Sequence, residues 1–141
     1  MLPCALITQR LKLAFVADVP TFELTGHGRC GVYHLEVAGH YAGAISVTGV
    51  SECHCEIGYE IEPEFRGRGI ASEAVGAIAG GLDFALLSAQ ARADNLASRR
   101  VLEKAGFRLA SSKLVWSYGE DAPLQIMAYH RLQAAPHQGD P

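Results

Sequence analysis

The sequence predicts an α/β fold, a single domain built on a mixed, mostly antiparallel sheet. Residues 5–61 contain short runs in which apolar and polar residues alternate, a pattern typical of β-strands. From Ala71 onward, apolar residues recur at spacings of three and four, which indicates a helix with one buried stripe. Alternation returns in residues 86–93. A strand–helix–strand crossover is therefore expected, with two parallel strands and a right-handed connection.

Four strands are expected before the helix, as an antiparallel meander. Each is an alternating run that ends at glycine, proline or polar residues. Residues 18–28 contain one proline and two glycines, so we expect a loop there, or at most one helical turn. The four expected strands are residues 5–16, 31–37, 41–48 and 53–61.

Two helices and three further strands complete the prediction. The first helix carries its apolar stripe over residues 71–85. The second begins after the cap Asp94-Asn95, ends at Gly106, and is expected to bury Ser98, Val101, Leu102 and Ala105. The remaining strands are residues 86–93, 107–118 and 124–132, so that residues 1–132 form one domain and residues 133–141 a flexible tail.

Composition excludes several classes of protein. The chain has 141 residues, of which 49% are hydrophobic and 19% charged, enough for one core and too apolar for a disordered chain. The sequence contains no run of 18 apolar residues, so no membrane span is expected. The first residues lack a charged leader ahead of an apolar block, so no secretory signal is visible and a cytoplasmic protein is expected.

The four cysteines are expected to be reduced, because a domain of this size needs no disulfides. Cys53-His54-Cys55 resembles a metal-binding pattern. In a strand, however, this spacing sends the two thiols to one face and the imidazole to the other. No metal is expected.

The net charge of −3 conceals a cationic middle third, in which residues 66–113 carry eight basic and four acidic side chains. A general nucleic-acid-binding surface would need a broader basic face, so no nucleic-acid partner is expected. The pattern suits one compact anionic ligand near Arg66 and Arg68. Scattered, solvated charges are the alternative.

The segment of residues 66–72, Arg-Gly-Arg-Gly-Ile-Ala-Ser, follows a strand and precedes a helix. Gly67 and Gly69 allow a tight turn, and the N–H groups of a helix start attract an anion. Arg66, Arg68 and the Ser72 hydroxyl can add hydrogen bonds. We therefore expect an anion-binding loop here. It is not a Walker loop, and Ser72 stands where a dinucleotide fingerprint needs glycine.

Two motifs resemble the acetyl-CoA motifs of the GNAT N-acetyltransferases. One is R-x-x-G-x-A at residues 66–71, and the other is N-x-x-S-x-x-V-L-E-K-A-G-F at residues 95–107. The segment G-Y-E-I-E-P-E-F-R-G-R-G at residues 58–69 and T-Q-R-L-x-L at residues 8–13 most resemble the branch that acetylates ribosomal-protein N-termini. The strong match covers residues 54–108.

This resemblance implies a sheet with a splayed parallel pair flanked by helices, and acetyl-CoA as cosubstrate. The implied reaction is direct attack of a primary amine, a peptide N-terminus or a small molecule, on the acetyl group. One alternative is a non-catalytic acyl-CoA-binding module that has lost its acceptor site. Another is a dinucleotide-binding fragment.

The resemblance also implies roles for single positions. The N–H groups of residues 66–71, with Ile70 and Ala71 at the helix start, would hold the CoA pyrophosphate. The main chain near Ile61 would pair with the pantetheine arm. Asn95 would bind pantetheine, cap the second helix, or do both.

Acetyl transfer requires a neutral amine and protonation of the leaving thiolate. Glu56 is the favoured base and Glu60 the second candidate, both on one face of the fourth strand; the alternative is that both are solvated edge carboxylates. Many N-terminal acetyltransferases have a tyrosine where this chain has Leu102. Ser98 is therefore the candidate proton donor, with a helix-capping role or bound water as alternatives.

Relatives usually place two helices, one wall of the acceptor site, between the first two strands. Here only residues 16–30 bridge that gap. The wall is therefore missing or borrowed. A homodimer could supply it, favoured by an apolar face that the short segment would leave exposed.

Overall fold

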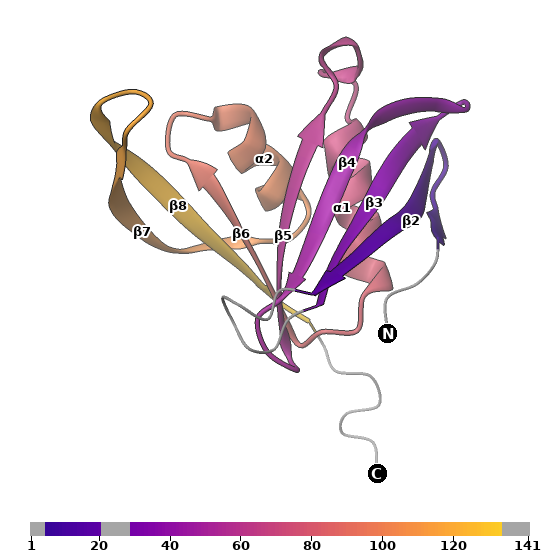
Figure 1. Ribbon diagram of the computed structural model, residues 1–141, viewed down its shortest axis with the longest axis horizontal. Helices are drawn as coiled ribbons and strands as arrows, with labels where there is room; N and C mark the ends of the chain where they lie inside the picture. Colours follow the sequence, from indigo (N-terminus) through magenta and orange to yellow (C-terminus); the bar gives the residue numbers. More distant parts are fainter. Residues whose placement is uncertain (1–4, 21–28, 134–141) are drawn as a thin grey trace.

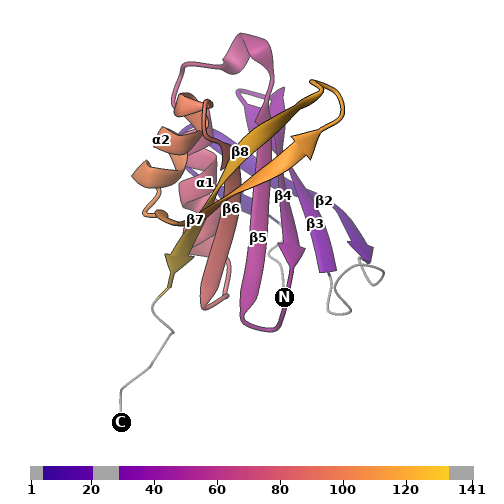
Figure 2. The same ribbon diagram turned by 90° about the vertical axis from the view of Figure 1, so that its left-hand side faces the viewer.

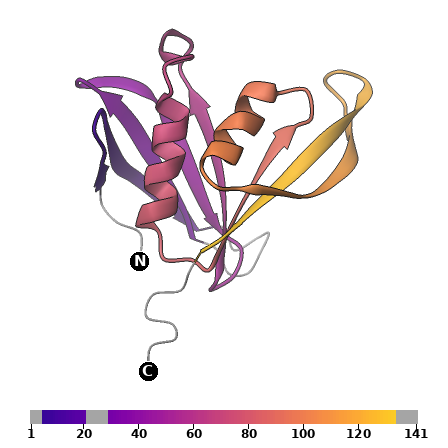
Figure 3. The ribbon, with the colours of Figure 1, turned by 180° about the vertical axis from the view of Figure 1, so that it is seen from behind.

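The computed structural model describes residues 5–20 and 29–133 (Figure 1). They form one eight-stranded sheet in the order β1-β2-β3-β4-β5-β6-β8-β7, with two α-helices on one of its faces (Figures 2 and 3). The elements are β1 (Ala5–Ile7), β2 (Leu11–Pro20), β3 (Arg29–Val37), β4 (His40–Gly49), β5 (His54–Ile61), the 3-10 turn η1 (Pro63–Phe65), α1 (Ile70–Gly81), β6 (Leu86–Arg92), α2 (Leu96–Lys104), β7 (Arg108–Ser117) and β8 (Ala122–Leu132).

The first expected strand is in fact two. Residues 5–16 divide into β1 and β2, which pair antiparallel with Ala5 opposite Ala14. A tight turn separates them, in which the Thr8 N–H donates to the Leu11 carbonyl at 2.9 Å. Sequence alternation continues across this turn, so the pattern gave no sign of it.

The loop prediction for residues 18–28 is wrong at its start. β2 continues to Pro20, because its last residues pair with β3, where Val19 lies opposite Cys30 and Pro20 opposite Arg29. Proline is tolerated at a strand end, where no ladder N–H is needed. The rest of that prediction, residues 21–28, lies outside the described residues.

The predicted parallel pair, joined through a helix, is confirmed. β5 and β6 are parallel, and they pair over only four positions, from His54 with Leu86 to Ile57 with Ala89. Beyond Ile57 the strands separate, and β6 continues only along β8 (Figures 1 and 3). The mixed sheet with a splayed parallel pair is therefore present.

Both helices pack on the sheet largely as predicted. α1 begins one residue earlier than expected and ends at Gly81, with Ala74, Val75 and Ile78 fully buried. In α2 only Leu102 is buried, while Ser98, Val101 and Ala105 are half-buried, since this helix faces the separated strands rather than a closed sheet. Gly106 ends α2 with φ 89°, as its position predicts.

Gln133 ties the end of β8 to the loop before β6. Its backbone N–H donates to the Ala85 carbonyl at 2.8 Å. Its side-chain amide donates to the carbonyls of Phe84 at 2.8 Å and Leu82 at 3.2 Å. Gln133, the first residue of the predicted tail, is therefore bound to the loop before β6, and residues 134–141 lie outside the described residues.

Across residues 5–20 and 29–133, no helix is long and apolar enough to cross a bilayer. The same residues contain no group of three or more His, Cys, Asp or Glu side chains placed to hold a metal ion.

Candidate functional site

A cavity of about 520 Å³ lies where β5 and β6 separate, between the first turns of α1 and α2. It brings together most of the residues that the sequence singled out and adds Tyr59, Phe65, Ala97 and Val101, which sequence reasoning missed. Arg68 and Glu56 do not line it. The predicted residues that do are Glu60, Ile61, Arg66, Gly67, Gly69, Ile70, Ala71, Ser72, Asn95 and Ser98.

The start of α1 presents free N–H groups to this cavity. Gly69 is the N-cap, with a left-handed backbone (φ 75°), and no side chain caps the helix. The first helical hydrogen bond runs from Glu73 N–H to the Gly69 carbonyl, at 3.1 Å. Within the described chain, the N–H groups of Ile70, Ala71 and Ser72 have no acceptor. This arrangement fits an anionic ligand group.

Both glycines of the loop adopt a conformation that other residues rarely take. Gly67 has φ 77° and Gly69 has φ 75°. A Cβ at Gly67 would meet nothing within 4 Å, and one at Gly69 would lie 3.5 Å from Arg10 Nη2. Backbone conformation rather than lack of space therefore requires glycine here.

The two predicted arginines lie differently. Arg66 lines the cavity, and its Nε donates to the Ile61 carbonyl at 2.9 Å, closing the loop back onto the end of β5. That carbonyl, at the position expected to pair with pantetheine, thus accepts one hydrogen bond from Arg66 and keeps a second lone pair. The Arg68 guanidinium lies 5.3 Å from the centre of the Phe65 ring, a cation–π contact outside the cavity.

Asn95 caps α2. Its Oδ1 accepts a hydrogen bond from the Ser98 N–H at 3.1 Å, as an N-cap side chain should. The amide also lines the cavity. Asn95 therefore both caps α2 and lines the cavity.

Tyr59 and Ser98 form a hydrogen bond across the cavity. Tyr59 Oη lies 2.7 Å from Ser98 Oγ and 3.3 Å from the Ser98 carbonyl oxygen, to which it can donate. The Ser98 hydroxyl is thus engaged with Tyr59 rather than with the backbone of its own helix. Burial raises the pKa of the Tyr59 hydroxyl, and the hydrogen bond to Ser98 offsets part of this.

Glu56 and Glu60 share one face of β5, as predicted, and this face is opposite the one that buries Cys55, Ile57 and Ile61. Glu60 reaches the cavity and Glu56 does not. Glu56 lies opposite Ser88 in the parallel register, one position before the strands separate. His54, on the same face, has its Nε2 2.7 Å from Ser88 Oγ. The imidazole and the buried thiol of Cys55 thus face opposite sides of the sheet, as the spacing predicts.

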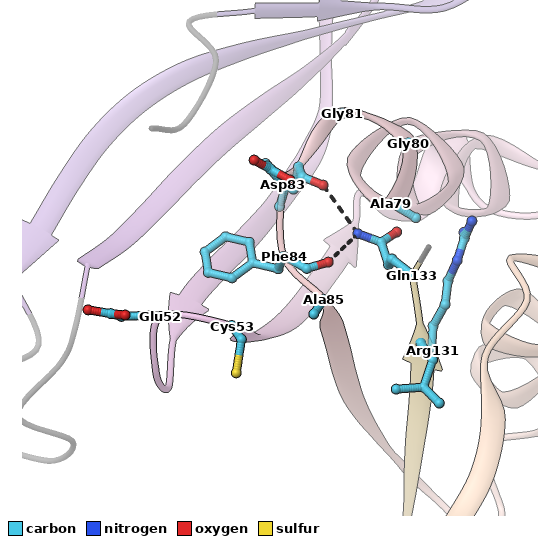
Figure 4. A pocket seen from close by; sticks show the side chains of 12 residues that line it. Glu52, Cys53, Ala79, Gly80, Gly81, Asp83, Phe84, Ala85, Arg131 and Gln133 are labelled. Atoms are coloured by element: carbon cyan, nitrogen blue, oxygen red, sulfur yellow. Dashed lines mark hydrogen bonds between the residues drawn. The ribbon is translucent and has the colours of Figure 1, made fainter. Parts of the chain in front are cut away.

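A second cavity of about 560 Å³ lies at the other end of the crossover, lined by the end of α1, the loop before β6 and the end of β8 (Figure 4). Its side chains include Glu52, Cys53, Asp83 and Arg131. The Gln133 amide is already bound to two carbonyls of its wall (Figure 4). None of the described residues that line it belongs to the start of a helix. The cavity beside α1 and α2 is therefore the candidate functional site.

The chain belongs to the GNAT acetyltransferase family. The family described as "Acetyltransferase (GNAT) domain" matches residues 11–108, more than half of the chain. This match confirms the class of enzyme that the motifs predict, an acetyl-CoA-dependent N-acetyltransferase. No curated protein sequence matches the chain.

Solved structures show the same fold at low sequence identity. RimL, the ribosomal L7/L12 alpha-N-protein acetyltransferase in complex with coenzyme A, superposes with a TM-score of 0.71 at 17% identity, covering 93% of this chain and 97% of RimL. The Salmonella typhimurium acetyltransferase that modifies the N-terminal serine of ribosomal protein L7/L12 gives 0.66 at 23% identity, over 80% and 68% of the two chains. The microcin C7 self-immunity acetyltransferase MccE, in complex with acetyl-CoA and AMP, gives 0.63 at 18% identity, over 74% and 61%.

Proposed function

We propose that this cavity binds acetyl-CoA and that the protein transfers its acetyl group to a primary amine, either a peptide N-terminus or a small molecule. The observation that carries the proposal is the row of unbonded N–H groups at the start of α1, facing a cavity between separated parallel strands. Phosphate is one of the anions that such a helix start binds. The separated strands leave room beside β5 for an extended arm.

The residues that contact the cofactor divide into two groups by role. The N–H groups of Ile70, Ala71 and Ser72 hold the pyrophosphate, with Gly67 and Gly69 shaping the loop and the Arg66 guanidinium beside it. The β5 main chain and Asn95 contact the pantetheine arm. Acetyl-CoA supplies the activated acetyl group, and the chain's own residues orient it and handle the proton.

Glu56 and Glu60 are our candidates for the base that deprotonates the acceptor amine. Both carboxylates lie on the open face of β5, and Glu60 reaches the cavity. Glu56 lies one residue before the point of separation, so it can act there through a water molecule. Their different positions make two single variants informative.

We propose that a second copy of the chain supplies the missing acceptor wall. The outer face of β4 and β5 carries polar side chains, among them Glu56, Glu60, Ser46 and Thr48. Exposed apolar side chains gather on the β7–β8 hairpin, at Leu109, Leu114, Trp116 and Tyr118, whereas Ile7, Tyr41 and Leu96 lie singly on other described elements. A dimer should therefore use this hairpin. We also propose a cytoplasmic location, since a domain of this size needs no disulfides for its stability.

Two measurements test the function. Calorimetry should show CoA binding, and thiol release from acetyl-CoA should depend on an added primary amine. The acceptors tested are small amines and peptides with a free N-terminus. Each peptide is paired with the same peptide acetylated at its N-terminus, which should not react. CoA binding without turnover on any amine would favour the acyl-CoA-binding module, and lack of CoA binding would remove both functions.

A further inference from the structure

The Tyr59–Ser98 contact joins the two sides of the candidate site. Tyr59 belongs to β5 and Ser98 to the first turn of α2, 39 residues later, and both line the cavity. Tyr59 lies two residues beyond Ile57, the last β5 position that pairs with β6. The contact therefore sits at the base of the opening, whereas the anion-binding N–H groups lie at its rim.

The two hydroxyls can exchange donor and acceptor roles without movement of any heavy atom. In one arrangement Ser98 donates to Tyr59 Oη, and Tyr59 donates to the Ser98 carbonyl oxygen, 3.3 Å away. In the other, Tyr59 donates to Ser98 Oγ across 2.7 Å, and the Ser98 hydrogen is released toward the cavity. An anion at the base of the cavity would select the second arrangement. Donors already in place stabilise a developing charge without reorganisation.

The surroundings keep this pair neutral and available. The charged side chains that line the cavity are Glu60 from β5 and Arg66 from the loop, and Arg66 is bound to the Ile61 carbonyl. The cavity-lining residues of α1 and α2 carry no charge. Burial, which raises the pKa of the Tyr59 hydroxyl, keeps that group protonated as a donor near neutral pH.

We propose that Tyr59 is a positioning residue of the transferase, whose hydroxyl orients Ser98 so that Ser98 donates a hydrogen bond to the sulfur anion that leaves acetyl-CoA. This inference rests on the proposed function. The amine nitrogen bonds to the acetyl carbon, the carbon–sulfur bond breaks, and its electron pair stays on sulfur. Tyr59 and Ser98 keep their protons throughout, the amine proton goes to the base, and water later protonates the sulfur.

The test measures the ionisation of bound CoA, which needs no acceptor amine. Thiolate absorbance of CoA bound to the wild-type protein, followed against pH, should give a thiol pKa below that of free CoA measured in the same way. Tyr59→Phe and Ser98→Ala should each raise the pKa of the bound thiol by about one unit, the effect of losing one hydrogen bond to the anion. The double variant should add little, because the two residues act through one contact.

Tyr129→Phe is the matched control. Tyr129 also anchors α2, accepting from Arg99 Nε at 2.9 Å and donating to Glu103 at 3.2 Å, but it does not line the cavity. It should lower the melting temperature and leave the pKa of the bound thiol unchanged. With an amine acceptor, Tyr59→Phe should lower kcat about tenfold with little change in KM.

The outcomes separate the two hypotheses. If CoA binds equally well and its thiol pKa is the same in wild type, Tyr59→Phe and Ser98→Ala, the role of Tyr59 is refuted and the transferase function stands. An equal pKa shift in Tyr129→Phe also refutes it, since loosening of α2 would then suffice. If the wild-type protein does not bind CoA, both proposals fail.

Discussion

Arg10 and Glu73 form an ion pair, Nε to Oε1 at 2.8 Å, that fastens the turn between β1 and β2 to the first turn of α1. The Arg10 backbone N–H donates to the same carboxylate at 3.0 Å, and Thr8 Oγ1 contacts it as well. Through Nη1, Arg10 also donates to the Arg68 carbonyl at 2.9 Å. The pair therefore supports the anion-binding loop from behind.

Arg10→Ala should weaken CoA binding about threefold to tenfold, because it releases the Arg68 carbonyl and leaves the loop less well fixed. Calorimetry with CoA measures the change. Arg100→Ala, which removes an exposed arginine of α2 that does not line the cavity, is the control. An unchanged affinity in Arg10→Ala would show that the loop keeps its shape without this support.

Glu73→Gln should make stability less sensitive to acid. The Thr8 hydrogen bond, followed by those from Arg10 and the Arg10 charge, lowers the pKa of the Glu73 carboxyl below its ordinary value, against the opposing effect of burial. Such a group stabilises the fold above its unfolded-state pKa, about 4.3, and this stabilisation is lost as pH falls through the folded-state pKa. Urea unfolding at several pH values measures the effect. The exposed Glu64 supplies the control variant, Glu64→Gln, and an equally steep acid loss in Glu73→Gln and wild type would contradict the prediction.

Gly69→Glu should abolish CoA binding, because it places a carboxylate beside the N–H groups that would hold the pyrophosphate. Gly69 has a left-handed backbone (φ 75°), so replacing it with a residue that carries a side chain should lower the free energy of unfolding by about 1 kcal/mol. Gly69→Ala carries the same strain without the charge. It should therefore bind CoA measurably when Gly69→Glu does not. Equal affinities in these two variants would contradict the assignment of this loop.

Gly76→Ala should raise the free energy of unfolding by about 1 kcal/mol, since glycine in a helix interior is less favourable than alanine. A Cβ at Gly76 meets nothing within 4 Å. Gly81→Ala should gain less, because its Cβ would lie 2.6 Å from Leu6 Cδ2, which must move. Urea unfolding of the two variants measures this difference, and CoA affinity should stay unchanged in Gly76→Ala.

Glu56→Gln and Glu60→Gln should distinguish the two candidate bases. Loss of the base should lower kcat/KM most on the acidic side of the pH profile, where the amine most needs deprotonation, and by about 10²-fold or more. The variant that removes the carboxylate without this role should keep a pH profile of kcat/KM parallel to that of the wild type. If both keep the wild-type pH dependence, neither carboxylate is the base.

The loop and its helix could be predicted because their signals are local. Gly67, Gly69 and the apolar stripe of α1 lie within one short segment, and the crossover that holds them is confirmed. The contacts that complete the site are distant in sequence. Arg10 is 63 residues from Glu73, and Tyr59 is 39 residues from Ser98, so no periodicity could pair them.

The division between β1 and β2 was also not predictable from the alternation of apolar and polar residues. Alternation continues through Thr8 and Leu11, and the chain reverses at two hydrogen bonds between these residues. The extension of β2 to Pro20 likewise depends on the partner strand β3 rather than on its own residues. Pattern therefore predicts which segments are strands better than it predicts where they stop.

The four-residue seam between β5 and β6 has a mechanical consequence. It is the stretch of backbone pairing that joins the β1–β5 half of the described sheet to the half made of β6, β8 and β7. An elongated ligand bound above this seam would contact both halves of the sheet and restrict their relative motion. Part of the binding free energy would offset the loss of that motion. Amide hydrogens of β6 far from any ligand atom would then exchange more slowly once the gap is filled.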